Sequence, residues 1–305
     1  MIKRVFEITK RFLCDPLIRI GYLSNIGVTN IISDEKYLKI KYKLAMGKEL
    51  DLNHPKTYNE KLQWLKLYDR QDAYIKMVDK YAVKEYVAGV IGSQYIIPTL
   101  GVWENFDSIE FDKLPKQFVL KCTHDSGGIV ICKNKDELDI KAAKKIINKC
   151  LRRNYFWSGR EWPYKKVPRR ILAETYLENG IEGLHDYKIW CFNGKATYIQ
   201  YITGRISGVT YERFYDRNWN PKEFSYHNPK LKTEISRPKK LTEMLDLAES
   251  LAKNTSFLRV DLYLLNDNTV KFGELTFYPM SGFDRWHPDS IDKEFGDMIN
   301  IADLI

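Results

Sequence analysis

The sequence lacks most of the short motifs that mark nucleotide and catalytic sites. It contains neither GxxxxGK[ST] nor GxGxxG, which excludes a P-loop and a Rossmann fingerprint. GxSxG and HExxH are also missing, which excludes a serine-hydrolase elbow and a zincin helix. No two aspartates stand two positions apart, and the five histidines show no metal-ligand spacing. We therefore expect neither the DxD metal motif of nucleotide-sugar transfer nor a histidine-based transition-metal site.

Long apolar runs and paired cysteines are also scarce. No run approaches the roughly 18 apolar residues of a membrane span, and the first residues lack the apolar core and cleavage site of a signal peptide. The cysteines are odd in number, widely spaced and without a CxxC pair: Cys14, Cys122, Cys132, Cys150 and Cys191. This pattern favours reduced thiols in a cytoplasmic protein over a disulfide framework or a zinc site.

The chain does have a positive net charge and many aromatic residues. Its 305 residues include 49 Lys and Arg against 40 Asp and Glu, a formal net charge of +9. A basic chain can meet nucleic acid, anionic lipid or an anionic small molecule. The basic residues are scattered and no nucleic-acid motif is present, so we expect no nucleic-acid partner. The 20 Tyr and 7 Trp could stack on sugars, although we expect most of them in the core.

The order of expected elements predicts an α+β fold built largely from antiparallel hairpins. Helical periodicity marks the first third, with Asp34 and Asn59 as expected caps, and strands begin at Lys116. Asn193-Gly194 is a strong type I′ hairpin signal. We expect four parts, 1–55, 56–115, 116–178 and 179–305. Helices are expected at 2–18, 34–47, 59–69, through 75–87, at 139–152, 238–253 and from 288, and strands at 117–121, 129–133, 171–177, 186–192, 195–201, 211–216 and within 257–276.

The stretch Phe257–Thr276 predicts a β-hairpin with its loop at residues 266–269. This register places Asp261 directly across from Glu274. Two facing carboxylates repel unless a positive charge lies between them, and Mg²⁺ accepts carboxylate oxygens while keeping positions open for phosphate. The alternative is a surface hairpin whose acids pair with Arg259 or Lys271. By alternation, one face carries Arg259, Asp261, Phe272 and Glu274.

Lys121 ends an expected strand and precedes the loop Cys122–Gly128, which contains two glycines. Backbone N–H groups in such a loop can approach a phosphate closely, and the lysine supplies charge. A plain hairpin turn is the alternative. The phosphate interpretation gains weight from the acidic hairpin, because ATP chemistry requires both a phosphate cradle and carboxylates for Mg²⁺.

The order of these pieces resembles the ATP-grasp ligases, in particular the TupA-like ATP-grasp proteins of bacterial surface-polysaccharide gene clusters. The resemblance covers nearly the whole chain and implies an ATP-grasp fold with an N-terminal helical extension. The tail LRVDLYLLNDNTVKFGELTFYPMSGF is similar to the metal-binding hairpin and following loop of the superfamily. The other matching segments are LDLNHPKTYNEKLQWLKLYDR (50–70), VDKYAVKEYV (78–87), LPKQFVLKCTHDSGG (114–128), REW (160–162), PRRILAETYLEN (168–179), DYKIWCFNGK (186–195) and FYDRNW (214–219).

The resemblance implies ATP and Mg²⁺ as cofactors and a role for individual residues. Lys80 and Lys121 resemble the lysines that reach the ATP phosphates, the second at the edge of a lid loop. Glu174 resembles the hinge acid that binds the adenine amino group, and Asp186 stands where the ribose-binding acid usually stands. The full set implied to contact ATP is Lys80, Lys121, Ser126, Gly127, Gly128, Glu174, Tyr176, Leu177 and Asp186.

Asp261 and Glu274 resemble the magnesium ligands of the superfamily. Arg259 resembles the cation that steadies the reacting carboxylate or phosphate, so Arg259 and Lys121 are the candidate catalytic residues. The superfamily often has Glu-x-Asn on the second metal strand, whereas Thr276 stands two residues after Glu274 here. A hydroxyl is a poorer ligand than an amide oxygen, so the number of metal ions, one or two, stays open.

The implied activity is that of a carboxylate–amine ligase that forms an acylphosphate, in capsule, teichuronopeptide or O-antigen biosynthesis. An amino acid or a uronic acid is the expected substrate, in a pocket shaped by the loop 277–283. Three other functions stay open: a polysaccharide glycosyltransferase, an ATP-dependent kinase of a sugar or lipid carrier, and a non-catalytic nucleotide-binding partner. Candidate ligands for the substrate carboxylate are Lys188, Arg205, Arg213 and Arg285.

The expected location is the cytoplasm, and the N-terminus leaves one question open. Residues 2–18 predict a helix with a basic face and an apolar face. Such a helix can lie on an anionic membrane surface, and more often packs on its own protein. Peripheral membrane contact through residues 1–20 is therefore the alternative to simple packing.

Overall fold

The computed structural model describes residues 15–180, 183–204 and 208–304. Most of the helix expected at 2–18 lies outside these residues, and the described chain opens on α2 (Pro16–Asn25), which Asp15 caps. Within the described ranges, no helix has both the length and the apolar character needed to cross a membrane.

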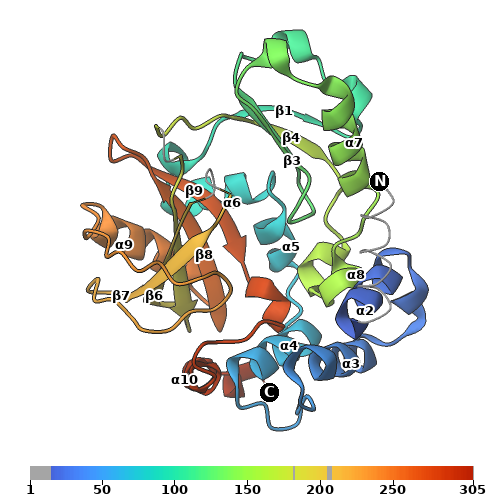
Figure 1. Cartoon of the computed structure of the whole chain (residues 1–305), viewed down its shortest axis with the longest axis vertical. Helices are drawn as coiled ribbons and strands as arrows, with labels where there is room; N and C mark the ends of the chain where they lie inside the picture. The colour runs from blue at the N-terminus through green and yellow to red at the C-terminus, as the bar shows by residue number, and fades with distance from the viewer. Residues whose placement is uncertain (1–14, 181–182, 205–207, 305) are drawn as a thin grey trace.

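Helices and antiparallel strands follow one another largely as the sequence predicts (Figure 1). The α+β class is confirmed. The other α-helices are α3 (Asp34–Met46), α4 (Tyr58–Tyr68), α5 (Ala73–Val78), α6 (Val83–Ile91), α7 (Ile140–Leu151), α8 (Phe156–Gly159), α9 (Leu241–Ala252) and α10 (Ser290–Met298). The strands are β1 (Thr99–Trp103), β2 (Phe118–Cys122), β3 (Ile129–Cys132), β4 (Ile171–Thr175), β5 (Asp186–Phe192), β6 (Lys195–Thr203), β7 (Tyr211–Asp216), β8 (Phe257–Leu264) and β9 (Val270–Thr276).

Two details of the helical part differ from the prediction. The caps are Ser33 for α3 and Thr57 for α4, rather than Asp34 and Asn59, because their hydroxyls accept the free amides of the first turn. The single helix expected through 75–87 is two helices, α5 and α6. Between them the carboxylate of Asp79 accepts the amides of two following residues, which turns the chain.

The strands form two antiparallel sheets. The order in the four-stranded sheet is β1-β4-β2-β3, and in the five-stranded sheet β7-β6-β5-β8-β9. Figure 1 shows the four-stranded sheet with α7 at one end of the molecule, and the five-stranded sheet with α9 beside it. The predicted Asn193-Gly194 turn joins β5 to β6, with φ of 48° and 76°, both positive as a type I′ turn requires.

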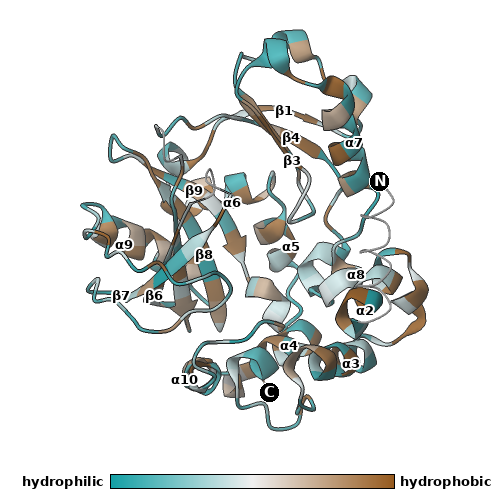
Figure 2. Ribbon diagram, in the orientation of Figure 1, coloured by the Kyte–Doolittle hydropathy of each residue, from teal (hydrophilic) through white to brown (hydrophobic). Residues whose placement is uncertain are grey.

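Each sheet has its own hydrophobic core. Phe118, Leu120 and Cys122 alternate along β2 and pack against Ile147 and Cys150 of α7. A larger core joins the five-stranded sheet to α4, α9 and α10, with Trp190 fully buried among aromatic rings. In Figure 2 the strands of the four-stranded sheet are mostly brown and the connecting loops mostly teal. The cysteines of the described residues are all buried and free, as the sequence predicts: Cys122, Cys132, Cys150 and Cys191.

Gly296 lets α10 pack on the start of α4, and we expect its replacement by Ala to destabilise the protein. A Cβ at this position would lie 2.2 Å from the carbonyl oxygen of Lys56 and 2.7 Å from Thr57 Cα. Both neighbours are backbone atoms that no rotamer change can move. We expect Gly296→Ala to lower the free energy of unfolding by about 3 kcal/mol, measured by urea denaturation.

Gly89 provides the matched control, because it also lies inside a helix, α6. A Cβ there would meet nothing within 4 Å. Ala is the better helix former, so Gly89→Ala is expected to raise the free energy of unfolding by about 1 kcal/mol. Equal effects of the two substitutions would contradict the packing of α10 on α4.

Candidate active site

The predicted hairpin forms and contains the predicted pairing of Asp261 with Glu274, although the pairs nearer the loop are shifted by one residue. Asp261 of β8 pairs with Glu274 of β9, and Arg259 pairs with Thr276. The Arg259 guanidinium holds the Asp261 carboxylate through two bonds, Nε to Oδ1 at 2.7 Å and Nη2 to Oδ2 at 2.8 Å. It also lies 3.6 Å from Glu274 Oε1 and donates to Thr276 Oγ1 at 3.1 Å. One guanidinium therefore links both carboxylates.

Phe272 does not share this face, which corrects one part of the prediction. A β-bulge makes Gly273 the extra residue, so Phe272 pairs with Leu262 and lies in the core. A Cβ on Gly273 would lie 3.0 Å from the carbonyl oxygen of Asp261. The bulge shifts the alternation along β9 by one residue. Glu274 therefore keeps the predicted face opposite Asp261, and Phe272 does not.

Strand β5 completes this charged cluster from the other side of β8. Lys188 pairs with Asp261, and its ammonium binds Asp261 Oδ2. Asp186 Oδ1 lies 3.6 Å from the same ammonium. Burial would raise the pKa of Asp261, but the charges of Arg259 and Lys188 hold it below its ordinary value. The carboxylate is therefore ionised at neutral pH.

A second charged cluster lies on the four-stranded sheet. Glu174 of β4 forms ion pairs with Lys121 of β2 and with Lys84 of α6, the latter at 2.6 Å. In the sheet register these charged side chains share a face with Ile129 and Ile131 of the edge strand β3. Ile131 is 59% exposed. A face that carries both lysines and open apolar side chains suits a heterocycle with attached phosphates.

Sequence reasoning did not single out Lys84. Its ammonium also donates to the carbonyl oxygen of Ile97 at 2.7 Å and to Thr99 Oγ1 at 2.9 Å. Burial lowers the pKa of Lys84, and the charge of Glu174 opposes that shift. Lys80 lies in the turn before α6, so spacing from it does not point to Lys84, and no local signal marks this residue.

Lys80 lies in the turn between α5 and α6 and contacts the loop that joins β2 to β3. Its ammonium donates to the carbonyl oxygen of Asp125 at 2.6 Å, and its amide donates to the carbonyl oxygen of Thr123 at 3.1 Å. The buried Asp125 carboxylate binds Arg153 Nη2 at 2.5 Å. The expected phosphate lysine therefore holds the expected lid loop.

The two glycines of this loop lie against α7 and the residues that follow it. Gly128 has φ of 67°, and a Cβ there would lie 2.5 Å from the Cβ of Cys150, so packing on α7 requires glycine. A Cβ on Gly127 would lie 3.1 Å from Arg153 Nη2. Ser126 is exposed at the same loop. Close packing thus accounts for Gly128 without a phosphate.

Tyr176 and Leu177 directly follow β4 and are half-buried. They continue the strand that carries Glu174, as a hinge segment would. Tyr176 lines a hollow of about 590 Å³. The other residues around this hollow are Pro115, Lys116, Gln117, Lys133, Asn134 and Thr175.

The three described candidates for a substrate carboxylate do not gather in one place. Lys188 belongs to the cluster around Asp261. The buried Arg213 donates to the carbonyl oxygens of Leu231 and Lys232 and so holds that segment. Arg285 is exposed and donates to the carbonyl oxygen of Ala45 at 3.3 Å, at the end of α3. Arg205 lies outside the described residues.

The donor set of the hairpin fits a single magnesium ion. Asp261 and Glu274 face each other across the two strands, and Glu274 is 42% exposed. Magnesium usually takes one or two carboxylates and completes its shell with phosphate oxygens and water. Among the described residues no group of three or more His, Cys, Asp or Glu side chains could hold a metal. A site made by protein ligands alone is therefore not available in this part of the chain.

Comparison with known proteins assigns the chain to a family. The sequence model of the family described as TupA-like ATPgrasp matches residues 60–300. No curated protein matches significantly.

Two similar solved structures share little sequence identity with this chain. D-alanyl-alanine synthetase A from Vibrio cholerae is 15% identical, with 68% of this chain and 57% of that chain covered and a TM-score of 0.41. D-alanine–D-alanine ligase from Bacillus anthracis complexed with ATP is 20% identical, with 73% and 65% covered and a TM-score of 0.40. The chain thus spans less than two thirds of the length of either protein. Because the family model matches well over half of the chain, the chain belongs to the TupA-like ATP-grasp family, within the superfamily of ATP-grasp ligases.

Proposed function

We propose that the protein joins a carboxylate to an amine at the expense of ATP, through an acylphosphate. The observation that carries this proposal is the pair of charged clusters on two sheets. Lys121 and Glu174 lie on the four-stranded sheet and are joined by Lys84 of α6, and Arg259 and Asp261 lie on the five-stranded sheet. Family membership supports the same conclusion.

The reaction would proceed in two steps that balance. An oxygen of the substrate carboxylate attacks the γ-phosphorus of ATP, a P–O bond forms, the bond to the bridging oxygen breaks, and ADP leaves. The amine then attacks the acyl carbon, the C–O bond to phosphate breaks, and the amine gives up a proton. Phosphoryl transfer needs little covalent help but much alignment and charge neutralisation.

The chain's own cations supply that neutralisation in the proposed mechanism. Lys80 and Lys121 would bind the ATP phosphates, and Arg259 would hold the transferred phosphoryl group or the tetrahedral oxyanion. Mg²⁺ held by Asp261 and Glu274 would neutralise further phosphate charge. Arg259 and Lys188 occupy the Asp261 carboxylate in the described structure. Lys188 also has a second anion in reach, Asp186 Oδ1 at 3.6 Å, which would balance its charge where Asp261 serves as a metal ligand.

The remaining contacts are proposed on the pattern of the superfamily. Glu174 and the backbone of Tyr176 and Leu177 would bind adenine, Asp186 the ribose, and the loop Ser126–Gly128 would close over the phosphates. Exclusion of water matters because an acylphosphate hydrolyses readily. We propose an amino acid or a uronic acid as substrate, with Lys188, Arg205 and Arg285 as candidate ligands.

The proposed setting is bacterial surface-polysaccharide biosynthesis in the cytoplasm, including capsule, teichuronopeptide or O-antigen. Contact with the inner face of the membrane through residues 1–20 is part of the proposal for localisation. Several side chains of the adjoining segment are exposed and apolar, in keeping with such contact: Ile18, Tyr22, Ile26, Val28 and Ile31.

The test is ADP and phosphate release from ATP with Mg²⁺ across a panel of amino acids and uronic acids. Release that needs both an acid and an amine would establish the ligase. A phosphorylated sugar as product would indicate a kinase instead, and hydrolysis of a sugar nucleotide would indicate a glycosyltransferase. Tight ATP binding without turnover on any pair would favour a non-catalytic partner. Failure to bind ATP would refute the proposal.

A further inference from the structure

A buried glutamate near the hairpin has no cation in contact with it. Glu161 follows α8 and is only 4% exposed. No lysine or arginine nitrogen of the described residues lies within 4.0 Å of its carboxylate. Burial of a carboxylate is costly unless a cation or several donors compensate it. Burial accordingly raises the pKa of Glu161, although the charges of Lys66 and Lys41 and the hydroxyl of Ser281 oppose that shift.

The two lysines whose charges act on Glu161 donate their hydrogen bonds elsewhere, and the Lys41 ammonium donates to the carbonyl oxygen of Ser158 at 2.6 Å. The Lys66 ammonium, fully buried in α4, donates to Gln63 Oε1 at 2.9 Å and to the carbonyl oxygens of Gly159 and Ser281 at 2.8 and 2.7 Å. It also donates to Ser281 Oγ at 3.0 Å. Four oxygens thus share its three protons. Lys66 fixes the loop around Ser281 without forming an ion pair with Glu161.

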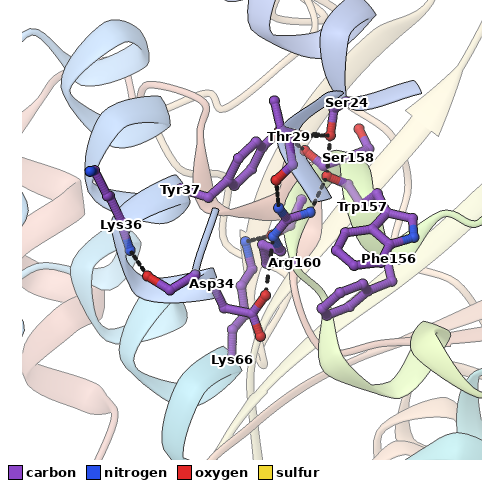
Figure 3. Close-up of polar contacts among 12 residues, drawn as sticks. Ser24, Thr29, Asp34, Lys36, Tyr37, Lys66, Phe156, Trp157, Ser158 and Arg160 are labelled. Carbon is purple, nitrogen blue, oxygen red and sulfur yellow. Dashed lines mark hydrogen bonds and ion pairs between the residues drawn. The ribbon is translucent and has the colours of Figure 1, made fainter. Parts of the chain in front are cut away.

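The backbone that carries Glu161 is held firmly by its neighbour Arg160 (Figure 3). The buried Arg160 guanidinium donates to the carbonyl oxygens of Trp157 at 2.9 Å and Thr29 at 2.8 Å, and lies 3.1 Å from Asp34 Oδ1. Its carbon lies 4.1 Å from the centre of the Tyr37 ring. The segments α2 to α3 therefore position the Glu161 carboxylate.

Strained backbone surrounds the same carboxylate. Arg160, Met280 and Ser281 have φ of 54°, 48° and 56°, in the left-handed region that non-glycine residues seldom adopt. A Cβ on Gly159 would lie 2.1 Å from Ser281 Oγ and 3.2 Å from Glu161 Oε1, so both oxygens converge on this glycine. Conformations of this kind persist where the surrounding structure enforces them, and they concentrate at functional sites.

Two tyrosines place Glu161 next to the metal hairpin. The charge of Glu161 is the largest cause that raises the pKa of Tyr155, and the charge of Glu274 contributes to it as well. Burial raises the pKa of Tyr164, and the same two carboxylates add to that shift. The charges of Glu161 and Glu274 therefore act on the same two phenols. Ser281, whose Oγ converges with Glu161 Oε1 on Gly159, belongs to the turn Pro279–Gly282 that follows β9, the strand of Glu274.

We propose that Glu161 binds the amino group of the amine substrate, with Ser281 as the second contact of that group. The inference rests on the proposed ligase function and adds to it a residue that selects a primary amine. An ammonium would supply the cation that the carboxylate lacks, and the hydroxyl would accept or donate a further bond. The location beside Glu274 would bring the nitrogen to the acyl carbon. Arg160 acts as a positioning residue in this scheme.

The test compares the wild type with Glu161→Gln, and with Glu104→Gln as the matched control at an exposed glutamate. For Glu161→Gln we expect the KM for the amine to rise about 10- to 100-fold, as the loss of a charged hydrogen bond implies. The KM for ATP should not change. Hydroxylamine in place of the amine should still yield hydroxamate at the wild-type rate, because acylphosphate formation does not use Glu161. The control should behave as the wild type.

A thermal unfolding scan separates a substrate ligand from a structural role. A buried carboxylate kept for a ligand lowers stability, so Glu161→Gln should unfold at the wild-type temperature or above it. A fall of several degrees, or an unchanged KM for the amine, would overturn the inference. A wild-type protein that releases no ADP with any acid and amine would refute the ligase itself, before any variant is compared.

Discussion

Replacement of Asp261 by Asn is expected to lower ATP turnover about 1000-fold, the largest effect of any single substitution in the proposed site. A metal ion contributes several kcal/mol to stabilisation of the transition state, and each 1.4 kcal/mol corresponds to a factor of ten in rate. The amide is a weaker magnesium ligand than the carboxylate. It also leaves Arg259 and Lys188, both bound to Asp261, without their shared anion. The measurement is ADP release at saturating ATP and Mg²⁺.

Two further variants make this result specific. Asp267→Asn changes an exposed aspartate in the turn of the same hairpin, where Asp267 Oδ1 accepts the amide of Thr269 at 2.8 Å. Turnover should be unaffected there. Glu274→Gln changes the facing carboxylate, which is partly exposed, so turnover should fall with little loss of stability. Wild-type turnover in Asp261→Asn would remove the metal hairpin from the mechanism.

The second large effect is expected for Lys121→Met, which should lower kcat/KM for ATP about 100-fold, the usual result of losing one donor to a developing charge. Lys121 binds Glu174 in the described structure, and Lys84 binds the same carboxylate from the opposite side. Glu174 therefore keeps one cation after the substitution, and the fold should persist. Isothermal titration with ADP and steady-state kinetics measure the change.

Lys113→Met is the control for this variant, because Lys113 is an exposed lysine whose ion-pair partner among the described residues is the exposed Glu110. Its kcat/KM for ATP should equal the wild-type value. If Lys121→Met and Lys113→Met give the same kinetics, Lys121 does not reach the nucleotide. The charged face of the four-stranded sheet would then need another explanation.

Local signals in the sequence were sufficient for most of the fold. The Asn193-Gly194 turn joins β5 to β6 through its positive φ angles. The pairing of Asp261 with Glu274 was predicted from a loop at 266–269, whereas Leu264 pairs with Val270 and the bulge at Gly273 brings Glu274 opposite Asp261. The bulge at Gly273 was not predictable, because it depends on how β8 and β9 pack within a five-stranded sheet. The break between α5 and α6 was missed for a related reason. The apolar spacing continues through Asp79, whose capping bonds become visible only in three dimensions.

The candidate site was predictable only where one segment carries the whole pattern. Asp261, Glu274 and Arg259 belong to one hairpin, so alternation alone places them together. Lys84 of α6 forms the second ion pair of Glu174. It lies 90 positions away from Glu174 in the sequence and has no periodic signal of its own. Glu161 was not predicted because its burial away from a contacting cation depends on tertiary packing. The adjacent residues Glu161 and Trp162 give no sign of that burial in the sequence.

The division into two cores has a consequence for how the chain folds as it is made. All members of the smaller core lie between Phe106 and Ala173, so that core can form as soon as this continuous stretch has left the ribosome. The larger core joins residues from Ile20 to Val87 with residues up to Ile299. It cannot be completed until residue 299 has been synthesised. During synthesis the four-stranded sheet with α7 would therefore fold before α10 is available to pack on α4.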